Sequence, residues 1–169
     1  MSGPYPTLST EEAVTHIQNG DMISFSGFTP AGSAKAVPMA LAQRATEEHA
    51  KGHPFKVRVL TGASSGYSID EALAKADAIA WRGPYQADGT LRQQINRQEV
   101  EYVDMHLSHL PQAVAEEFLW QIDTAVVEAT EITPDGRVYL TTSIGASPTY
   151  LKYAKKVIIE INRHQSLRL

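Results

Sequence analysis

Short apolar segments alternate with helical segments along most of this chain, and this alternation constrains the possible fold more than any other feature of the sequence. Strands are expected at residues 22–26, 55–60, 78–81, 100–103, 124–128, 138–140 and 157–161. Helices are expected in a short segment that Ser9 caps and at 36–51, 69–76, 91–96, 111–120 and 147–153. Strands separated by helices favour parallel pairing, because a parallel connection has to cross the sheet. The sequence therefore predicts an α/β fold, with an open, mostly parallel sheet covered by helices on both faces.

Three loops rich in small residues or proline follow the first three expected strands. They are GFTPAGS at 27–33, TGASSG at 61–66 and RGPY at 82–85. Ligands bind at the carboxyl ends of strands in such sheets, so the three loops should share one rim. Glycines in the first loop would let a ligand approach the backbone, although an ordinary strand–helix connection fits it equally well. For 61–66, a capping and turn segment is the simpler interpretation of the residues alone.

Charge, cysteine content and hydropathy exclude several classes of function. The chain carries 15 Lys and Arg against 19 Asp and Glu, a net charge of −4, and it lacks a basic run that would bind nucleic acid. It has no cysteine, which excludes disulfides, thiolate zinc sites and a cysteine nucleophile. The first residues do not resemble a signal peptide, and no apolar stretch is long enough to span a membrane. We therefore expect a cytoplasmic protein that contacts neither membrane nor nucleic acid.

Four further side chains invite a chemical role. His106 and His109 are spaced like a helical metal pair, but the sequence offers no obvious third ligand, so no metal site is expected. Glu128 and Glu160 lie in or at the end of apolar strands, where an acid must be solvated, paired or shifted in pKa. Glu128 could line a pocket, but a paired structural role is the preferred interpretation for both glutamates.

Several segments together resemble the acetyl-CoA hydrolase/transferase family, the single-chain group of class I CoA-transferases. They are SGFTPAGSAKAVPMALA at 26–42, LTGASSG at 60–66, RGPY at 82–85, LRQQIN at 91–96, VEYVDMHLS at 100–108, VVEATEITPDG at 126–136 and KKVIIEIN at 155–162. They occur in the family's order, cover nearly the whole chain and match only the N-terminal part of the family's sequence. Ser33-Ala34 departs from the family pattern, which often has Gly-Tyr-Pro around this point.

The resemblance implies an enzyme that moves CoA between an acyl-CoA and a small carboxylate, or hydrolyses acetyl-CoA, through a glutamyl–CoA thioester. The family's nucleophilic glutamate lies in the C-terminal half, so no catalytic residue is expected in this chain. CoA is then a substrate, and no cofactor is bound permanently. Residues 1–169 would form the N-terminal domain of a longer two-domain chain, with the missing C-terminal domain and further copies of the enzyme as partners.

The same resemblance assigns a substrate- and CoA-binding role to the first two loops. The first loop would line the acyl and CoA cleft, and the serine of TGAS would contact the carboxylate or the reacting acyl group. The residues assigned to this site are Gly27, Phe28, Thr29, Pro30, Ala31, Gly32, Thr61, Gly62, Ala63 and Ser64.

Two other functions remain open for a chain of this architecture. One is a non-catalytic module that binds CoA esters. The other is a sugar-phosphate isomerase-like domain, which would need a cation beside a phosphate-binding loop. Lys35 is the only candidate for that cation.

Overall fold

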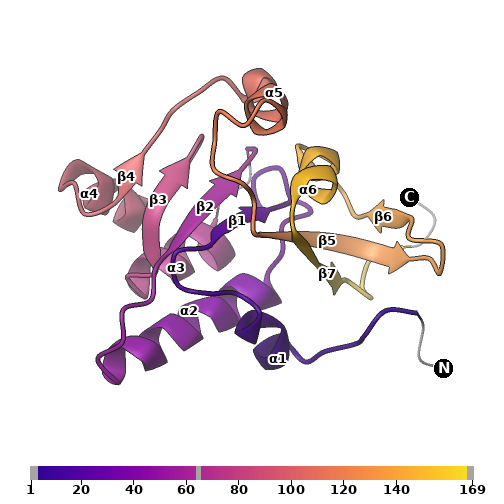
Figure 1. The fold of residues 1–169 in the computed structure, drawn as a ribbon, viewed down its shortest axis with the longest axis horizontal. Helices are drawn as coiled ribbons and strands as arrows, with labels where there is room; N and C mark the ends of the chain where they lie inside the picture. The colour runs from indigo at the N-terminus through magenta and orange to yellow at the C-terminus, as the bar shows by residue number, and fades with distance from the viewer. Residues whose placement is uncertain (1–3, 64–65, 167–169) are drawn as a thin grey trace.

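The computed structural model describes residues 4–63 and 66–166 (Figure 1). Its strands are β1 (Met22–Phe25), β2 (Val57–Thr61), β3 (Ile79–Gly83), β4 (Glu101–Tyr102), β5 (Thr124–Ile132), β6 (Val138–Leu140) and β7 (Lys156–Ile161). Its α-helices are α1 (Thr10–Thr15), α2 (Ala36–Ala50), α3 (Ala72–Lys75), α4 (Gly89–Asn96), α5 (Leu110–Ala115) and α6 (Ser147–Tyr153). A π-helical turn, η1 (Tyr67–Glu71), leads into α3, and a 3₁₀ turn, η2 (Leu107–His109), leads into α5.

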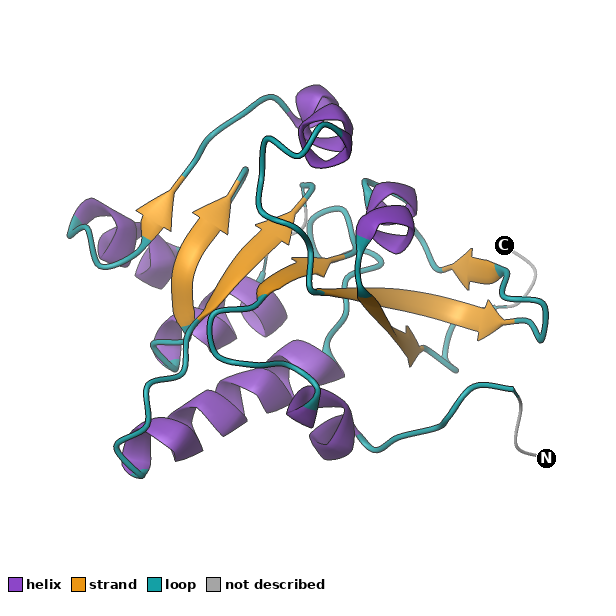
Figure 2. Cartoon of the chain, in the orientation of Figure 1, coloured by secondary structure: helices purple, strands orange, loops and turns teal. Residues whose placement is uncertain are grey.

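The strands form one sheet in which all pairings are parallel except that of β5 with β6 (Figure 2). The order runs β4-β3-β2-β1-β5, and every residue of β7 pairs with β5. Both β1 and β7 pair with the segment from Thr124 to Val126, so they flank β5 on opposite sides. β6 returns antiparallel along the end of β5. The predicted fold class is confirmed.

Helices cover both faces of this sheet. Side chains of α1, α2, α3 and α4 pack on one face around Ile23, Val59 and Val126. Those of α5 and α6 pack on the other face, in a second cluster of buried residues that includes Leu60 and Tyr150. In the part of the chain that the structure describes, no helix combines the length and apolar character needed to cross a lipid bilayer.

The first predicted helix has the cap that its sequence indicates. The Glu12 amide donates to Ser9 Oγ at 3.1 Å, and the Ser9 amide donates to Glu12 Oε2 at 2.8 Å. This reciprocal pair is a capping box, in which two amides that the helix leaves unpaired are satisfied by side chains. The helix therefore begins where the local sequence predicts.

Several predicted boundaries are wrong, and the largest differences are at the ends of one helix and one strand. The helix expected at 111–120 ends at Ala115, because Glu117 turns to a left-handed φ of 58° and breaks the helical hydrogen-bond pattern. Phe118, an apolar residue within the predicted helix, lies beyond its end and is 78% exposed. The strand expected at 124–128 continues to Ile132, because β6 folds back and satisfies the backbone groups of its second half.

Candidate functional site

The Gly27–Gly32 loop leaves the carboxyl end of β1 as a tight, closed turn. The amides of Phe28 and Ala31 each donate to the other residue's carbonyl oxygen, at 2.8 and 3.0 Å. Gly27 has a φ of 120°, and a Cβ there would lie 2.8 Å from Ser33 Cα, so only glycine fits. Phe28 is 56% exposed, which leaves its ring free to contact a ligand.

The two loops predicted to share a site are joined by a hydrogen bond. The amide of Thr29, a residue with a φ of 50°, donates to the carbonyl oxygen of Ala63 at 2.8 Å. Thr61 and Gly62 continue from the carboxyl end of β2, where the Thr61 hydroxyl donates to the Gly62 carbonyl oxygen at 3.0 Å. Ser64, the residue singled out for contact with the carboxylate, lies outside the described residues, as does Ser65.

A third segment, Thr141–Ala146, lies against the first loop and was missed by the sequence analysis. Ser143 Oγ donates to the Ala31 carbonyl oxygen at 2.8 Å, and a Cβ on Gly145 would lie 3.1 Å from the Gly27 carbonyl oxygen. Ile144 is 62% exposed. The sequence does indicate this segment, because TTSIGA has the small-residue composition of the other two loops and directly precedes helix α6.

The RGPY segment begins with Arg82, which forms a buried ion pair. Arg82 is fully buried and donates to Asp70 through Nε at 2.8 Å and through Nη2 at 3.3 Å. Asp70 lies in η1, so the ion pair joins η1 to the end of β3. Burial raises the pKa of the Asp70 carboxyl, although the Arg82 guanidinium opposes this. Arg82 is thus enclosed by protein rather than presented at the rim.

Glu128 and Glu160 both hold the segment that follows the first loop. Glu128, 2% exposed, accepts a hydrogen bond from Lys35 Nζ at 2.6 Å. Glu160 accepts from the amides of Lys35, Ala36 and Val37 at 2.8 to 3.1 Å, and so caps helix α2. A carboxylate at a helix N-terminus satisfies unpaired amides and the positive end of the helix dipole.

His106 and His109 stack edge to face, with ring centroids 5.5 Å apart, in the segment that leads through η2 into α5. Among residues 4–63 and 66–166, no three His, Cys, Asp or Glu side chains are grouped as a metal ion would require.

The family model for the acetyl-CoA hydrolase/transferase N-terminal domain matches residues 2–167, and so nearly the whole chain. The chain belongs to this family. The propanoyl-CoA:succinate CoA transferase of Escherichia coli is 48% identical over 169 residues, which are 100% of this chain and 34% of the relative. An acetyl-CoA hydrolase of Schizosaccharomyces pombe is 36% identical over 155 residues, 88% of this chain and 30% of the relative.

Solved structures share the fold of this chain. RipA from Yersinia pestis matches 94% of this chain and 37% of its own, with a TM-score of 0.71 and 24% identity. Glutaconate CoA-transferase from Acidaminococcus fermentans matches 90% of this chain and 68% of its own, with a TM-score of 0.67 and 13% identity. At these identities the likeness establishes the fold. The chain spans about a third of the length of the curated relatives it matches.

Proposed function

We propose that this chain supplies the N-terminal, substrate-binding part of an enzyme that moves CoA between an acyl-CoA and a small carboxylate, or hydrolyses acetyl-CoA. One observation carries the proposal. The Gly27–Gly32 loop and the Thr61–Ala63 segment meet at the carboxyl ends of β1 and β2, joined by the Thr29–Ala63 hydrogen bond. That is where open α/β sheets bind ligands, and the small residues leave the backbone accessible.

The proposed chemistry proceeds by covalent catalysis. A glutamate carboxylate attacks the thioester carbonyl of the acyl-CoA, which gives an acyl–glutamyl anhydride and releases CoA thiolate. The thiolate attacks the glutamyl carbonyl, forms the glutamyl–CoA thioester and releases the donor carboxylate. A second carboxylate then attacks the glutamyl–CoA thioester, which gives a new acyl–glutamyl anhydride and releases CoA thiolate. The thiolate attacks the acyl carbonyl of this anhydride, so the acceptor leaves as its acyl-CoA and the glutamate is regenerated. Attack by water on the glutamyl–CoA thioester gives hydrolysis instead.

The nucleophile of this reaction is proposed to lie in the C-terminal part of the relatives, outside this chain. Both carboxylate oxygens of Glu128 accept hydrogen bonds from protein side chains, and those of Glu160 cap α2, so neither group is free to attack a thioester. What this chain contributes is the first loop, the Thr61–Ala63 segment and Thr141–Ala146, which would enclose the acyl group and the adjacent part of CoA.

The exposed edge of the sheet supports a partner for this part of the enzyme. β7 pairs with β5 on one side, and Val157 and Ile161 are 42% and 41% exposed. An apolar groove of about 1080 Å³ runs along β7, with Leu8 and Val138 in its lining. We expect the remainder of the enzyme or a second copy of it to cover this surface, because apolar patches of this kind mark interfaces.

Calorimetric titration of the 169-residue chain with CoA and with acetyl-CoA, beside a thioester hydrolysis assay, tests the proposal. We expect binding without turnover at an enzymatic rate, because loss of a covalent nucleophile costs on the order of 10⁶-fold. Robust turnover with a thioester trapped on Glu128 or Glu160 would place the nucleophile in this chain. Binding without turnover by the full-length enzyme would instead identify a non-catalytic module that holds CoA esters.

The sugar-phosphate alternative has less support. It needs a free cation at a phosphate-binding loop, but Lys35 Nζ donates to Glu128 and to the Ser33 carbonyl oxygen at 2.7 Å. Titration with a sugar phosphate in the same calorimetric series tests this alternative directly.

A further inference from the structure

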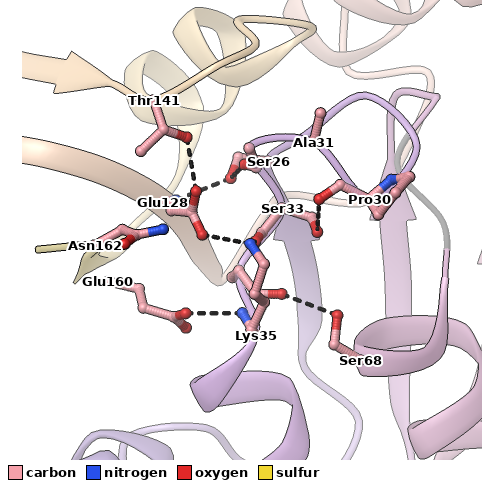
Figure 3. Close-up of polar contacts among 12 residues, drawn as sticks. Ser26, Pro30, Ala31, Ser33, Lys35, Ser68, Glu128, Thr141, Glu160 and Asn162 are labelled. Carbon is pink, nitrogen blue, oxygen red and sulfur yellow. Dashed lines mark hydrogen bonds and ion pairs between the residues drawn. The ribbon is translucent and has the colours of Figure 1, made fainter. Parts of the chain in front are cut away.

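Glu128 contacts residues beside the ends of two segments of the candidate site, the Gly27–Gly32 loop and Thr141–Ala146 (Figure 3). Its Oε2 accepts from Lys35 Nζ at 2.6 Å, and its Oε1 accepts from Thr141 Oγ1 at 2.7 Å. Its amide donates to Ser26 Oγ at 2.9 Å. One buried residue of β5 therefore contacts the residue before the first loop, a residue just after that loop and the first residue of the Thr141–Ala146 segment.

These contacts close the first loop at its base. Ser26 Oγ accepts from the Glu128 amide and donates to the Gly32 carbonyl oxygen at 2.9 Å, so it joins the two ends of the loop. Lys35 Nζ bridges Glu128 to the Ser33 carbonyl oxygen at 2.7 Å. The loop ends are thus fixed to β5 by side chains, although the loop itself belongs to no helix or strand.

The second segment is tied to the same carboxylate. Thr141, 9% exposed, binds Glu128, and two residues later Ser143 binds the Ala31 carbonyl oxygen. A buried carboxylate that loses either partner keeps its desolvation cost, so the arrangement that satisfies both oxygens is strongly favoured.

We infer that Glu128 is a positioning residue, whose carboxylate holds the Gly27–Gly32 loop and the Thr141–Ala146 segment in the one arrangement that accepts a CoA ester. The carboxylate acts through Lys35 and Thr141 and does not itself contact the ligand, whereas the bond to Ser26 comes from the Glu128 backbone amide. The part of this inference that concerns the ligand rests on the proposed function. The part that concerns the two segments stands on the contacts alone.

Hydrogen exchange of the 169-residue chain tests the inference, with Glu128→Gln as the main variant. Glutamine removes the negative charge and keeps only one acceptor oxygen, so it cannot accept from both Lys35 Nζ and Thr141 Oγ1 as Glu128 does. We expect exchange to accelerate roughly 10-fold in peptides that cover 27–33 and 141–146, with strand β2 unchanged. The amides of Phe28, Thr29 and Ala31 report on this opening, because each is hydrogen-bonded to a backbone carbonyl oxygen.

Glu160→Gln is the matched control, because Glu160 is the register partner of Glu128 on β7. It should loosen the start of α2 and lower the melting temperature without accelerating exchange in the two segments. Equal acceleration by the two variants across the whole chain would show that Glu128 contributes only to global stability, and would overturn the inference.

Lys35 supplies an independent perturbation of the same contact, in case Glu128→Gln does not fold. Its side chain is 42% exposed, so substitutions there are tolerated more easily. Lys35→Met should reproduce the local acceleration, and Lys35→Arg, which keeps the cation, should restore slow exchange. Fast exchange in both Lys35 variants or in neither would contradict a role for this ion pair.

Titration with acetyl-CoA, well below the melting temperature, separates the inference from the proposed function. We expect Glu128→Gln to weaken binding roughly 10-fold and Glu160→Gln to leave it unchanged. If the unmodified chain does not bind acetyl-CoA but Glu128→Gln still loosens the two segments, the proposed function fails and the positioning role remains. If both variants bind as tightly as the unmodified chain, the positioning for a ligand is wrong while the proposed function stands.

Discussion

The buried Asp70–Arg82 ion pair is expected to be among the most sensitive points of the fold. Both side chains are 0% exposed, and Asp70 accepts from Arg82 at 2.8 and 3.3 Å. Asp70→Asn preserves the shape of the side chain but removes the negative charge that faces the guanidinium. The substitution therefore takes away the negative charge that Asp70 supplies to the buried Arg82 guanidinium.

The size of the effect follows from the cost of keeping the Arg82 charge out of water after its ion-pair partner is removed. Breaking a buried ion pair by removing one partner costs about 3–5 kcal/mol. For a domain of 150–250 residues, about 2–4 °C is lost per kcal/mol, so the melting temperature should fall by roughly 6–20 °C. Circular dichroism during heating, supported by urea unfolding at pH 7, measures both quantities.

The neighbouring residue provides the control. Glu71 forms an ion pair with Lys75 in which both side chains are exposed, at 38% and 63%. Exposed pairs of this kind contribute little, so Glu71→Gln should leave the melting temperature essentially unchanged. Replacing both buried partners, as in Asp70→Leu with Arg82→Met, should recover much of the loss. Equal small shifts for Asp70→Asn and Glu71→Gln would refute the argument from desolvation.

Three further perturbations have distinct outcomes. Burial alone would raise the pKa of Asp123, but hydrogen bonds from Lys155 and a backbone amide lower it below its ordinary value. The stability that Asp123 contributes is therefore present above the pKa of the carboxyl in the unfolded chain, and it is lost as pH falls through the lower pKa of the folded state. The urea midpoints of Asp123→Asn and of the unmodified chain should therefore converge below about pH 4. Tyr150→Phe should leave thermal stability unchanged or raise it, because the buried hydroxyl has no hydrogen-bond partner among the described residues; a fall of several degrees would reveal one. In a full-length enzyme that contains this chain, Ser64→Ala should lower kcat/KM roughly 10- to 150-fold and Ser65→Ala should lower it less; equal small effects would contradict a role for Ser64.

Much of the fold is encoded locally and could be predicted from the sequence. The Ser9–Glu12 capping box sets the start of α1, and the apolar segments at 22–26 and 157–161 become β1 and β7. Helix α6 occupies the predicted residues 147–153. These features depend on residues a few positions apart, so their spacing alone indicates the structure. The placement of the small-residue loops after the strands also followed from this pattern, because the carboxyl ends of parallel strands lie on one edge.

The partners of the polar side chains were decided by the tertiary structure. Lys35 meets Glu128 across 93 positions of sequence, and Ser143 meets Ala31 across 112. These contacts exist because β5 lies between β1 and β7, with Glu128 in register with Glu160. Strand order and register depend on how whole elements pack against each other, and no local pattern specifies them. The sequence therefore indicated that Glu128 needs a partner, since a buried carboxylate must be compensated, but only the assembled sheet determined which residues supply it.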